Sequence, residues 1–218
     1  GDASGRPAYR RQVLAFYALL ERFRTAFPDV EIESCAGGGG RIDAGVLSRV
    51  HRFWASDCID AQSRLTIQRG FLQFFPPELM GSHVGAQMAH TTGRSQPLDF
   101  RAAVACQGHF GVELDIGKLD QDDTGRLRDW IAFYKDWRDL LHGDVWNGNL
   151  PDGQVWHGAG SADEWLLFVY RTAPTTQRYM PDLPLRFVDE AADYAVTRIG
   201  PGRGKADPTR IAGTWLYH

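Results

Sequence analysis

The sequence predicts an α/β fold up to about residue 145 and an antiparallel β region after it. Helix-type and strand-type segments alternate between residues 8 and 75 at the length of βα units. A long amphipathic helix follows at residues 127–141, and beyond it short strand candidates are separated by Pro, Gly and Asp. Alternation of this kind is typical of parallel strands joined by crossover helices.

The composition is that of a folded, water-soluble globular protein. Of the 218 residues 43% are hydrophobic and 23% are charged, and 24 basic residues against 27 acidic ones give a formal charge of −3. There is therefore no net basic field to attract nucleic acid or an anionic membrane. No apolar run reaches the roughly 18 residues of a membrane span, and no secretory signal opens the chain. We expect a cytoplasmic protein with neither nucleic acid nor membrane as partner.

The elements before residue 80 are predicted from hydrophobic periodicity and from the residues that end each element. Pro28 ends the first helix, a glycine run ends the first strand, and Pro76 and Pro77 close the last segment. The predicted elements are a helix at residues 8–27, a strand at 30–35, a strand ending at 53–56, a helix at 61–69 and a strand at 71–75.

The helix at residues 127–141 has one apolar stripe, with Asp122 and Asp123 at its start and Gly143 at its end. A β-only region is predicted to begin between residues 145 and 155, with no helix in it. Its expected strands are residues 154–157, 164–172, 185–188, 194–199 and 211–217.

The glycine run at residues 37–40 removes four side chains at the carboxyl end of a strand, where ligands bind in α/β folds. No Gly-Lys-Ser/Thr follows, so a phosphate-binding P-loop is disfavoured. Two interpretations stay open, an unusual turn and a close approach of the backbone to a ligand rich in hydroxyl groups. Glu33 and Cys35 share one face of the preceding strand, and Glu33 paired with an Arg in the core is the structural alternative.

Asp57 and Asp60 follow an aromatic strand end and are candidate general acids. Either one alternatively caps the next helix, and Asp60 fits the cap better. The seven His and three Cys residues have no zinc spacing, so we expect no metal and no cofactor. His83 and His90 flank a Gly/Thr-rich loop that is predicted to begin at Met80.

Seven stretches, ordered along residues 8–142, resemble the α-galactosidases of glycoside hydrolase family 36. They are Phe27-Pro28-Asp29-Val30, Glu33-Ser34-Cys35-Ala36-Gly37-Gly38-Gly39-Gly40-Arg41, Trp54-Ala55-Ser56-Asp57, Ile67-Gln68, Met80-Gly81-Ser82-His83-Val84, Thr92-Gly93-Arg94 and Ile131-Ala132-Phe133-Tyr134-Lys135. Three positions depart from many relatives, Ala36 in place of Ser and Cys58-Ile59 in place of Asp-Thr.

The resemblance implies the second half of a (β/α)₈ TIM-type barrel in residues 1–145 and an antiparallel β-sandwich-like domain in residues 146–218. It implies that Asp57 is the general acid/base of retaining hydrolysis of terminal α-galactosyl units, as in melibiose and raffinose. It also implies that Cys35, Ala36, Gly37 and Gly38 lie against the galactose hydroxyls.

Retaining hydrolysis needs a second carboxylate, the nucleophile. In the resembling family this is an Asp in a Lys-Trp-Asp segment, which this chain lacks. The resemblance therefore implies that strands one to four of the barrel and the nucleophile lie outside this chain. We expect the 218 residues alone to be inactive and the activity to belong to the full-length protein.

The expected partners are an α-galactoside oligosaccharide and the remainder of the same polypeptide, and a homo-oligomer is left open. Three alternatives remain. The first is another reaction of the same family, α-N-acetylgalactosaminidase activity or galactosyl transfer. The second is a non-catalytic carbohydrate-binding or structural fragment. The third is a self-sufficient α/β enzyme of a different kind.

Overall fold

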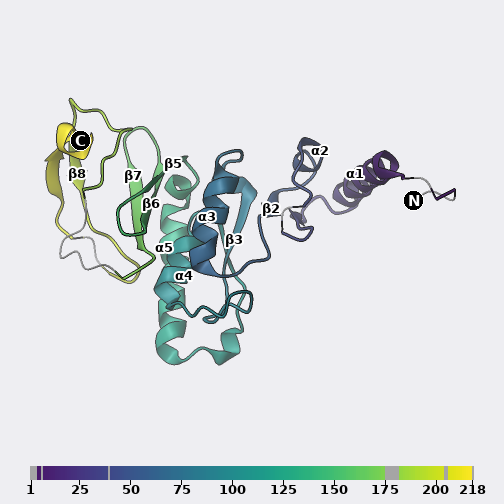
Figure 1. Cartoon of the computed structure of the whole chain (residues 1–218), viewed down its shortest axis with the longest axis horizontal. Helices are drawn as coiled ribbons and strands as arrows, with labels where there is room; N and C mark the ends of the chain where they lie inside the picture. Colours follow the sequence, from purple (N-terminus) through teal and green to yellow (C-terminus); the bar gives the residue numbers. More distant parts are fainter. Residues whose placement is uncertain (1–3, 6, 39, 175–181, 204–205, 218) are drawn as a thin grey trace.

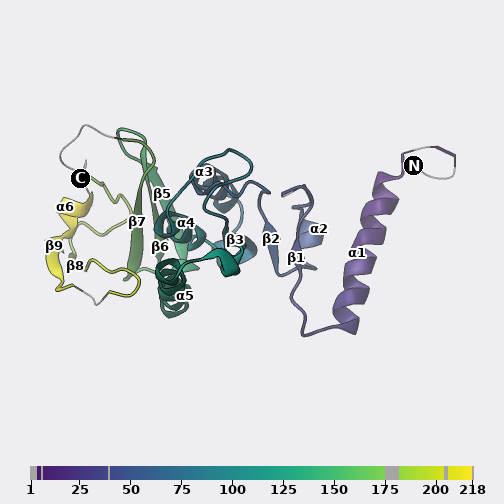
Figure 2. The ribbon, with the colours of Figure 1, turned by 90° about the horizontal axis from the view of Figure 1, so that it is seen from below.

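The computed structural model describes residues 4–5, 7–38, 40–174, 182–203 and 206–217 (Figure 1). The elements follow one another along an elongated molecule. Helix α1 (Tyr9–Ala26) lies at one end, a parallel sheet comes next, and helix α6 (Gly213–Tyr217) lies at the other end beyond antiparallel strands (Figures 1 and 2). Gly39, one member of the predicted glycine run, lies outside the described residues.

Four parallel strands in chain order form the first sheet. They are β1 (Glu33–Ser34), β2 (Arg52–Trp54), β3 (Met80–Val84) and β4 (His109–Val112). The connections between them contain helices α2 (Ala44–Leu47), α3 (Ala61–Leu72) and α4 (Leu98–Ala105), with short 3₁₀ turns at Pro77–Leu79 and Ile116–Lys118. The predicted parallel strands with crossover helices are confirmed, and the carboxyl ends of all four strands lie at one edge.

The prediction of a strand at residues 71–75 is wrong, because α3 continues to Leu72. The buried positions of α3 recur at helical spacing and include Phe71, so that side chain completes the inner face of the helix. The full set of buried α3 residues is Ala61, Arg64, Leu65, Gln68 and Phe71.

The prediction of a loop from Met80 is also wrong, because residues 80–84 form β3, the most buried strand of the sheet. Met80, Gly81 and Ser82 are all buried there. Gly81 is required by close packing, since a Cβ at this position would lie 2.4 Å from Oε2 of Glu33. Small residues in the middle of a sheet therefore replaced the β-branched pattern by which a strand is usually recognised.

Helix α1 covers residues 9–26, as predicted, but none of its residues is buried. Phe16, Tyr17 and Leu20 pack partly against the cluster around Phe53 and Met80, and the Tyr17 hydroxyl donates to Asp43 at 2.7 Å. Val13 and Phe23, which belong to the predicted apolar face, are 42% and 40% exposed. The helix is thus attached along only one side (Figure 2).

Helix α5 (Gln121–Leu141) begins six residues before its predicted start. Its N-cap is Asp120, whose side chain accepts from the backbone N–H of Asp123 at 2.7 Å. The first turns carry no apolar residue before Leu127, so the hydrophobic pattern alone places the start too late.

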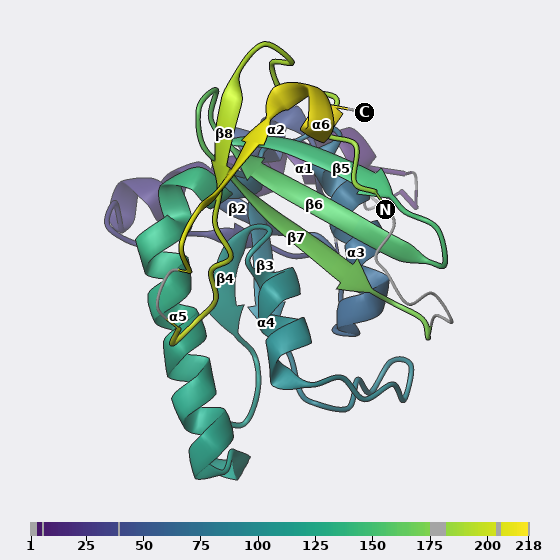
Figure 3. The same ribbon diagram turned by 90° about the vertical axis from the view of Figure 1, so that its left-hand side faces the viewer.

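A three-stranded antiparallel sheet follows and packs on the helices of the first part (Figure 3). Its strands are β5 (Asp144–Asn149), β6 (Gln154–Gly160) and β7 (Trp165–Arg171). The predicted strands at 154–157 and 164–172 are confirmed. Leu166 and Phe168 on β7 join the hydrophobic cluster formed by α4 and α5, so the two sheets share one core.

The remaining strands are β8 (Asp193–Val196) and β9 (Thr209–Ala212), which pair with each other. Three predictions are corrected here. Residues 185–188 form a turn closed by a Val188 N–H to Leu185 carbonyl bond of 3.1 Å, and the strand expected at 194–199 ends at Val196. Residues 213–217 form α6, so the expectation of no helix is wrong. Helical geometry lets Leu216 and Tyr217 reach the cluster around Leu185.

Among the described residues, no helix combines the length and the apolar character needed to cross a membrane.

Candidate active site

Asp57 lies at the edge of the parallel sheet where the strands end. It follows β2 by three residues and its side chain is exposed. Cys35, which follows β1 directly, directs its thiol toward Oδ1 of Asp57 at 3.7 Å. The parallel register of β1 and β2 produces this juxtaposition, because it pairs Ser34 with Phe53 and so brings the two strand ends together.

Gly38 brings the glycine segment into contact with the Asp57 turn. Its φ angle is +65°, and a Cβ at this position would lie 2.4 Å from the backbone nitrogen of Asp57. Any residue other than glycine would therefore be strained and would collide with the turn. Gly37 also has positive φ, at +58°, and Ala36 accepts from the Gly40 N–H at 3.0 Å, which closes the loop. The structure thus confirms the interpretation of the glycines as an unusual turn, packed closely against the Asp57 backbone, and the interpretation as a close approach to a ligand stays a prediction.

Asp60 has the alternative role, that of a helix cap. It is the N-cap of α3, is 1% exposed, and accepts from the Gln62 N–H at 3.1 Å and from the Ser63 hydroxyl at 2.9 Å. Arg94 forms an ion pair with Oδ2, the oxygen that also accepts from the Ser63 hydroxyl. Both carboxylate oxygens of Asp60 are thus engaged by structural partners in a buried position, which favours the role of helix cap over that of general acid.

Glu33 is paired with an arginine, which is the structural alternative predicted for it. Its Oε2 accepts from Arg52 Nε at 3.1 Å and lies 3.9 Å from Nε2 of His83. His83 stacks on Trp54 with ring centroids 4.2 Å apart, and its other nitrogen lies 3.3 Å from Glu113. This polar group connects all four strands below the sheet edge that carries Asp57. Among the described residues, no group of three or more His, Cys, Asp or Glu side chains is arranged to hold a metal ion.

The loop at residues 86–96 adjoins the same edge. The Thr91 hydroxyl lies 3.6 Å from the Cys58 thiol, beside the Asp57 turn. Arg101, a buried residue of α4, donates to the carbonyl of Gly85 at 2.6 Å and to that of Gln96 at 3.0 Å. One guanidinium therefore holds both ends of this loop.

Arg64 was not identified from the sequence. It is 1% exposed and its guanidinium donates to the carbonyls of Ser56 at 2.9 Å and Cys58 at 3.1 Å, the two neighbours of Asp57. The sequence contains a sign of its importance, because position 64 lies on the apolar face of α3 with Gln68 one turn later. A charged residue on a buried face needs a specific set of partners.

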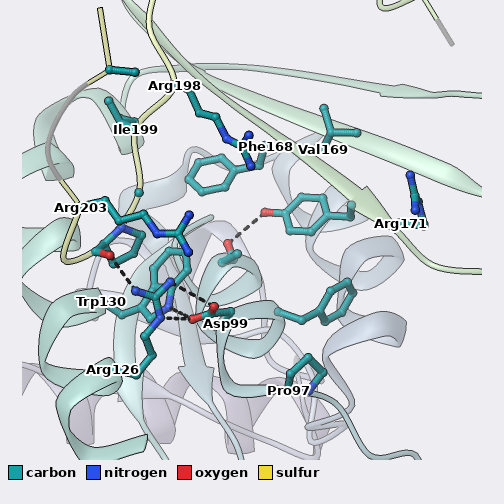
Figure 4. A pocket seen from close by; sticks show the side chains of 16 residues that line it. Pro97, Asp99, Arg126, Trp130, Phe168, Val169, Arg171, Arg198, Ile199 and Arg203 are labelled. Carbon is teal, nitrogen blue, oxygen red and sulfur yellow. Dashed lines mark hydrogen bonds and ion pairs between the residues drawn. The ribbon is translucent and has the colours of Figure 1, made fainter. Parts of the chain in front are cut away.

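Two pockets among the described residues lie away from Asp57. The larger, of about 740 Å³, is lined by α4, α5, β7 and residues 198–201, 203 and 206 (Figure 4). On its wall Asp99 accepts from Arg126 at 2.6 and 3.0 Å and from the Trp130 ring N–H at 2.8 Å, while Arg126 also donates to the Pro201 carbonyl at 2.7 Å. The second pocket, of about 440 Å³, lies between α3 and the β5–β6 hairpin. Neither is lined by the predicted site residues.

Comparison with known proteins identifies the chain's relatives. The family model described as Melibiase matches residues 2–143. An α-galactosidase from Escherichia coli is 46% identical over 196 residues, which cover 87% of this chain and 27% of that enzyme. Among solved structures, the family 36 α-galactosidase AgaB from Geobacillus stearothermophilus superposes with a TM-score of 0.85 at 33% identity, covering 99% of this chain and 30% of that one.

An AgaA variant from the same organism, crystallised in complex with raffinose, superposes with a TM-score of 0.82 at 32% identity, again over 99% of this chain and 30% of the other. The α/β part with its parallel sheet and the antiparallel strands thus match part of these enzymes. The chain belongs to the melibiase family, and within it to the family 36 α-galactosidases, of which it spans about 30% of the length.

Proposed function

We propose that this chain is the part of a retaining α-galactosidase that carries the general acid/base, Asp57. The single observation that supports this role is the position of Asp57 at the carboxyl edge of the parallel sheet, exposed and beside the Cys35 thiol and Gly38. Active sites of parallel α/β folds lie at this edge. Asp60, the only rival carboxylate in the same turn, is fully engaged as a helix cap and ion-pair partner.

In this proposal the four parallel strands are the second half of a (β/α)₈ barrel within residues 1–145, and residues 146–218 form the antiparallel C-terminal domain. The first half of the barrel, with the nucleophilic carboxylate, is contributed by the rest of the full-length protein. The proposed substrates are galacto-oligosaccharides such as melibiose and raffinose, the latter supported by the raffinose complex of the related AgaA variant.

The proposed reaction proceeds in two steps. Asp57 in its acid form first protonates the glycosidic oxygen while the nucleophile attacks the anomeric carbon, which gives a β-galactosyl-enzyme. Asp57, now a carboxylate, then takes a proton from the water that releases galactose with retained configuration. Cys35, Ala36, Gly37 and Gly38 are proposed to contact the galactose hydroxyls, a role supported by the contact between this segment and the Asp57 turn.

The test uses Asp57→Gly in the full-length enzyme. We expect kcat/KM for raffinose to fall by about 10²–10⁴, the usual contribution of general acid catalysis. For 2,4-dinitrophenyl α-galactoside, whose leaving group needs no proton, kcat/KM should change little. Azide should restore turnover of the activated substrate and yield α-galactosyl azide, because it attacks the β-galactosyl intermediate from the face normally used by water.

The matched control is Asp163→Asn, a change at an exposed aspartate in the turn between β6 and β7, which should leave both substrates unaffected. Formation of β-galactosyl azide instead would make Asp57 the nucleophile. Undiminished raffinose hydrolysis by Asp57→Gly would exclude Asp57 from the reaction.

A further inference from the structure

Arg64 is a buried arginine that makes no salt bridge with any carboxylate of the described residues. Its side chain is 1% exposed, and it is the largest side chain enclosed to this extent in the part of the chain that the structure describes. Burying an unpaired cation costs several kcal/mol unless dipoles and hydrogen bonds replace the lost water. The groups that take the place of water around Arg64 indicate the role of this residue.

Peptide carbonyls around the candidate acid supply most of these contacts. One nitrogen, Nη1, donates to the carbonyls of Ser56 at 2.9 Å and of Cys58 at 3.1 Å. Nη2 approaches the Gly81 carbonyl on β3 at 3.4 Å. The two carbonyls at Nη1 belong to the residues on either side of Asp57, so a single nitrogen bridges the turn from which the Asp57 carboxyl projects.

The rest of the guanidinium is fixed by rigid neighbours. Nε donates to Gln68 Oε1 at 2.9 Å, and the guanidinium lies over the Trp54 ring, 4.2 Å from its centre. Gln68 is itself held, because its Oε1 accepts from the Ser82 hydroxyl at 2.7 Å and its amide donates to the Val104 carbonyl at 3.0 Å. Through these hydrogen bonds Arg64 fixes the position of the Asp57 turn relative to α3, to β3 and to the end of α4.

The opposite side of the turn is bounded by Gly38, whose backbone leaves no space for a Cβ against the nitrogen of Asp57. Among the described residues, the Cys35 thiol at 3.7 Å is the one hydrogen-bond partner of the Asp57 carboxyl. The position of its carboxyl is thus set by the backbone of the turn rather than by hydrogen bonds to its oxygens.

We propose that Arg64 is a positioning residue for Asp57, which holds the acid/base at the correct distance from the glycosidic oxygen by bridging the carbonyls of Ser56 and Cys58. The inference depends on the proposed function in one respect, that Asp57 is the acid/base. Burial lowers the pKa of Arg64 to about 10, so the side chain remains a cation at neutral pH and makes charge-assisted bonds to both carbonyls. The carboxylates of Glu113 and Glu33 favour this charged form electrostatically without forming an ion pair with it.

The test compares Arg64→Lys and Arg64→Met in the full-length enzyme. Neither variant has the planar fork that holds two carbonyls together with Gln68. We expect kcat/KM for raffinose to fall by about 10- to 100-fold, the size of effect that misplacement of a catalytic group by about 1 Å produces. For 2,4-dinitrophenyl α-galactoside, which needs no proton from Asp57 in the first step, kcat/KM should fall by less than about threefold.

The control is Tyr134→Phe. Tyr134 is 8% exposed and its hydroxyl lies 3.0 Å from Nε2 of His142, so this variant also loses a buried hydrogen bond, but one outside the contacts of Arg64 and Gln68. It should lower Tm and leave the ratio of the two kcat/KM values unchanged. An unchanged ratio in Arg64→Lys would show that Arg64 serves stability alone and would overturn the proposal.

Failure of Arg64→Lys to fold would overturn it as well, because that variant keeps the charge and most of the volume. The proposed function is judged separately by azide rescue of Asp57→Gly. If that rescue succeeds while the Arg64 variants lose activity equally on both substrates, only the positioning role is rejected.

Discussion

His157 on β6 is a buried imidazole with one unsatisfied nitrogen. It is 2% exposed, its Nδ1 lies 2.9 Å from Oδ1 of Asn147, and its Nε2 has no hydrogen-bond partner in the described part of the chain. Burial lowers its pKa from 6.5 to about 4. The native protein therefore holds this ring neutral at the seam between the antiparallel sheet and the helices.

This shift makes stability depend on pH in a defined direction. The unfolded chain binds a proton at His157 below pH 6.5, whereas the folded chain does so only near pH 4. The contribution is fully present above pH 6.5 and is lost as the pH falls toward 4, by up to about 3 kcal/mol at roughly 1.4 kcal/mol per pH unit. Urea unfolding at pH 7.0 and 4.5 should show a smaller acid loss in His157→Phe than in the wild type.

Part of the acid loss should remain in that variant, because burial also lowers the pKa values of His109 and His142. His90 is exposed, so His90→Gln is the control and should retain the wild-type difference. An equal acid loss in His157→Phe and in the wild type would contradict the prediction.

At the scale of elements, two glycines of the same region should respond oppositely to alanine. Gly38 has positive φ and no space for a Cβ, whereas Gly70 lies inside α3 with nothing within 4 Å of the Cβ position. Gly70→Ala should stabilise the fold by about 0.5–1 kcal/mol through helix propensity. Gly38→Ala should displace the Asp57 turn and lower kcat/KM for raffinose at least tenfold, with a lower Tm.

Thermal unfolding and steady-state kinetics of the two variants measure both effects. Full activity in Gly38→Ala would mean that the glycine segment can move away from Asp57 without consequence, against the proposed role of that segment.

The sequence predicts the elements whose apolar spacing continues over several turns. Helices α1 and α3 and the strands β6 and β7 follow from their periodicity, and the cap at Asp60 follows from its residue type. The run of aromatic and apolar side chains ending at Phe75 was misread because Phe71 belongs to the helical pattern of α3. Strand β1 lies within the strand predicted at residues 30–35 but is only two residues long. Strand β3 contains Gly81, Ser82 and His83 and has no clear strand signal.

The same reasoning explains what was predictable about the site. The order of strand ends is enough to bring Cys35 and Asp57 together, since parallel strands end at one edge. The contacts of Arg64 and Arg101 are not predictable, because their partners are backbone carbonyls, which every residue has. A buried cation that binds backbone carbonyls needs no acidic partner, so no acidic residue in the sequence reveals its role.

At the scale of the whole molecule, the α/β part and the antiparallel sheet should unfold together. Leu166 on β7 is 6% exposed and lies in the cluster formed by α4 and α5, and the Tyr170 hydroxyl bonds to the Ala103 carbonyl. Leu166→Ala should cost about 2–5 kcal/mol, the usual range for a buried leucine. Hydrogen exchange should then accelerate in α5 as well as in β7.

Leu167 on the same strand is the matched control, since it is 39% exposed and Leu167→Ala should cost much less. Faster exchange in β7 alone, with α5 protected as in the wild type, would show two independent folding units.

The two hydrogen bonds from Arg101 to the carbonyls of Gly85 and Gln96 have a consequence for engineering. Arg101 lies outside the loop at residues 86–96 and holds both of its ends by hydrogen bonds. The interior of the loop can therefore be exchanged while its end points stay fixed. A graft should keep Arg94, because its ion pair satisfies the buried carboxylate of Asp60, and Ala89, which is 3% exposed. Libraries built within those two anchors, with Arg94 and Ala89 constant, would vary the surface beside Asp57 while the sheet that carries it is left intact.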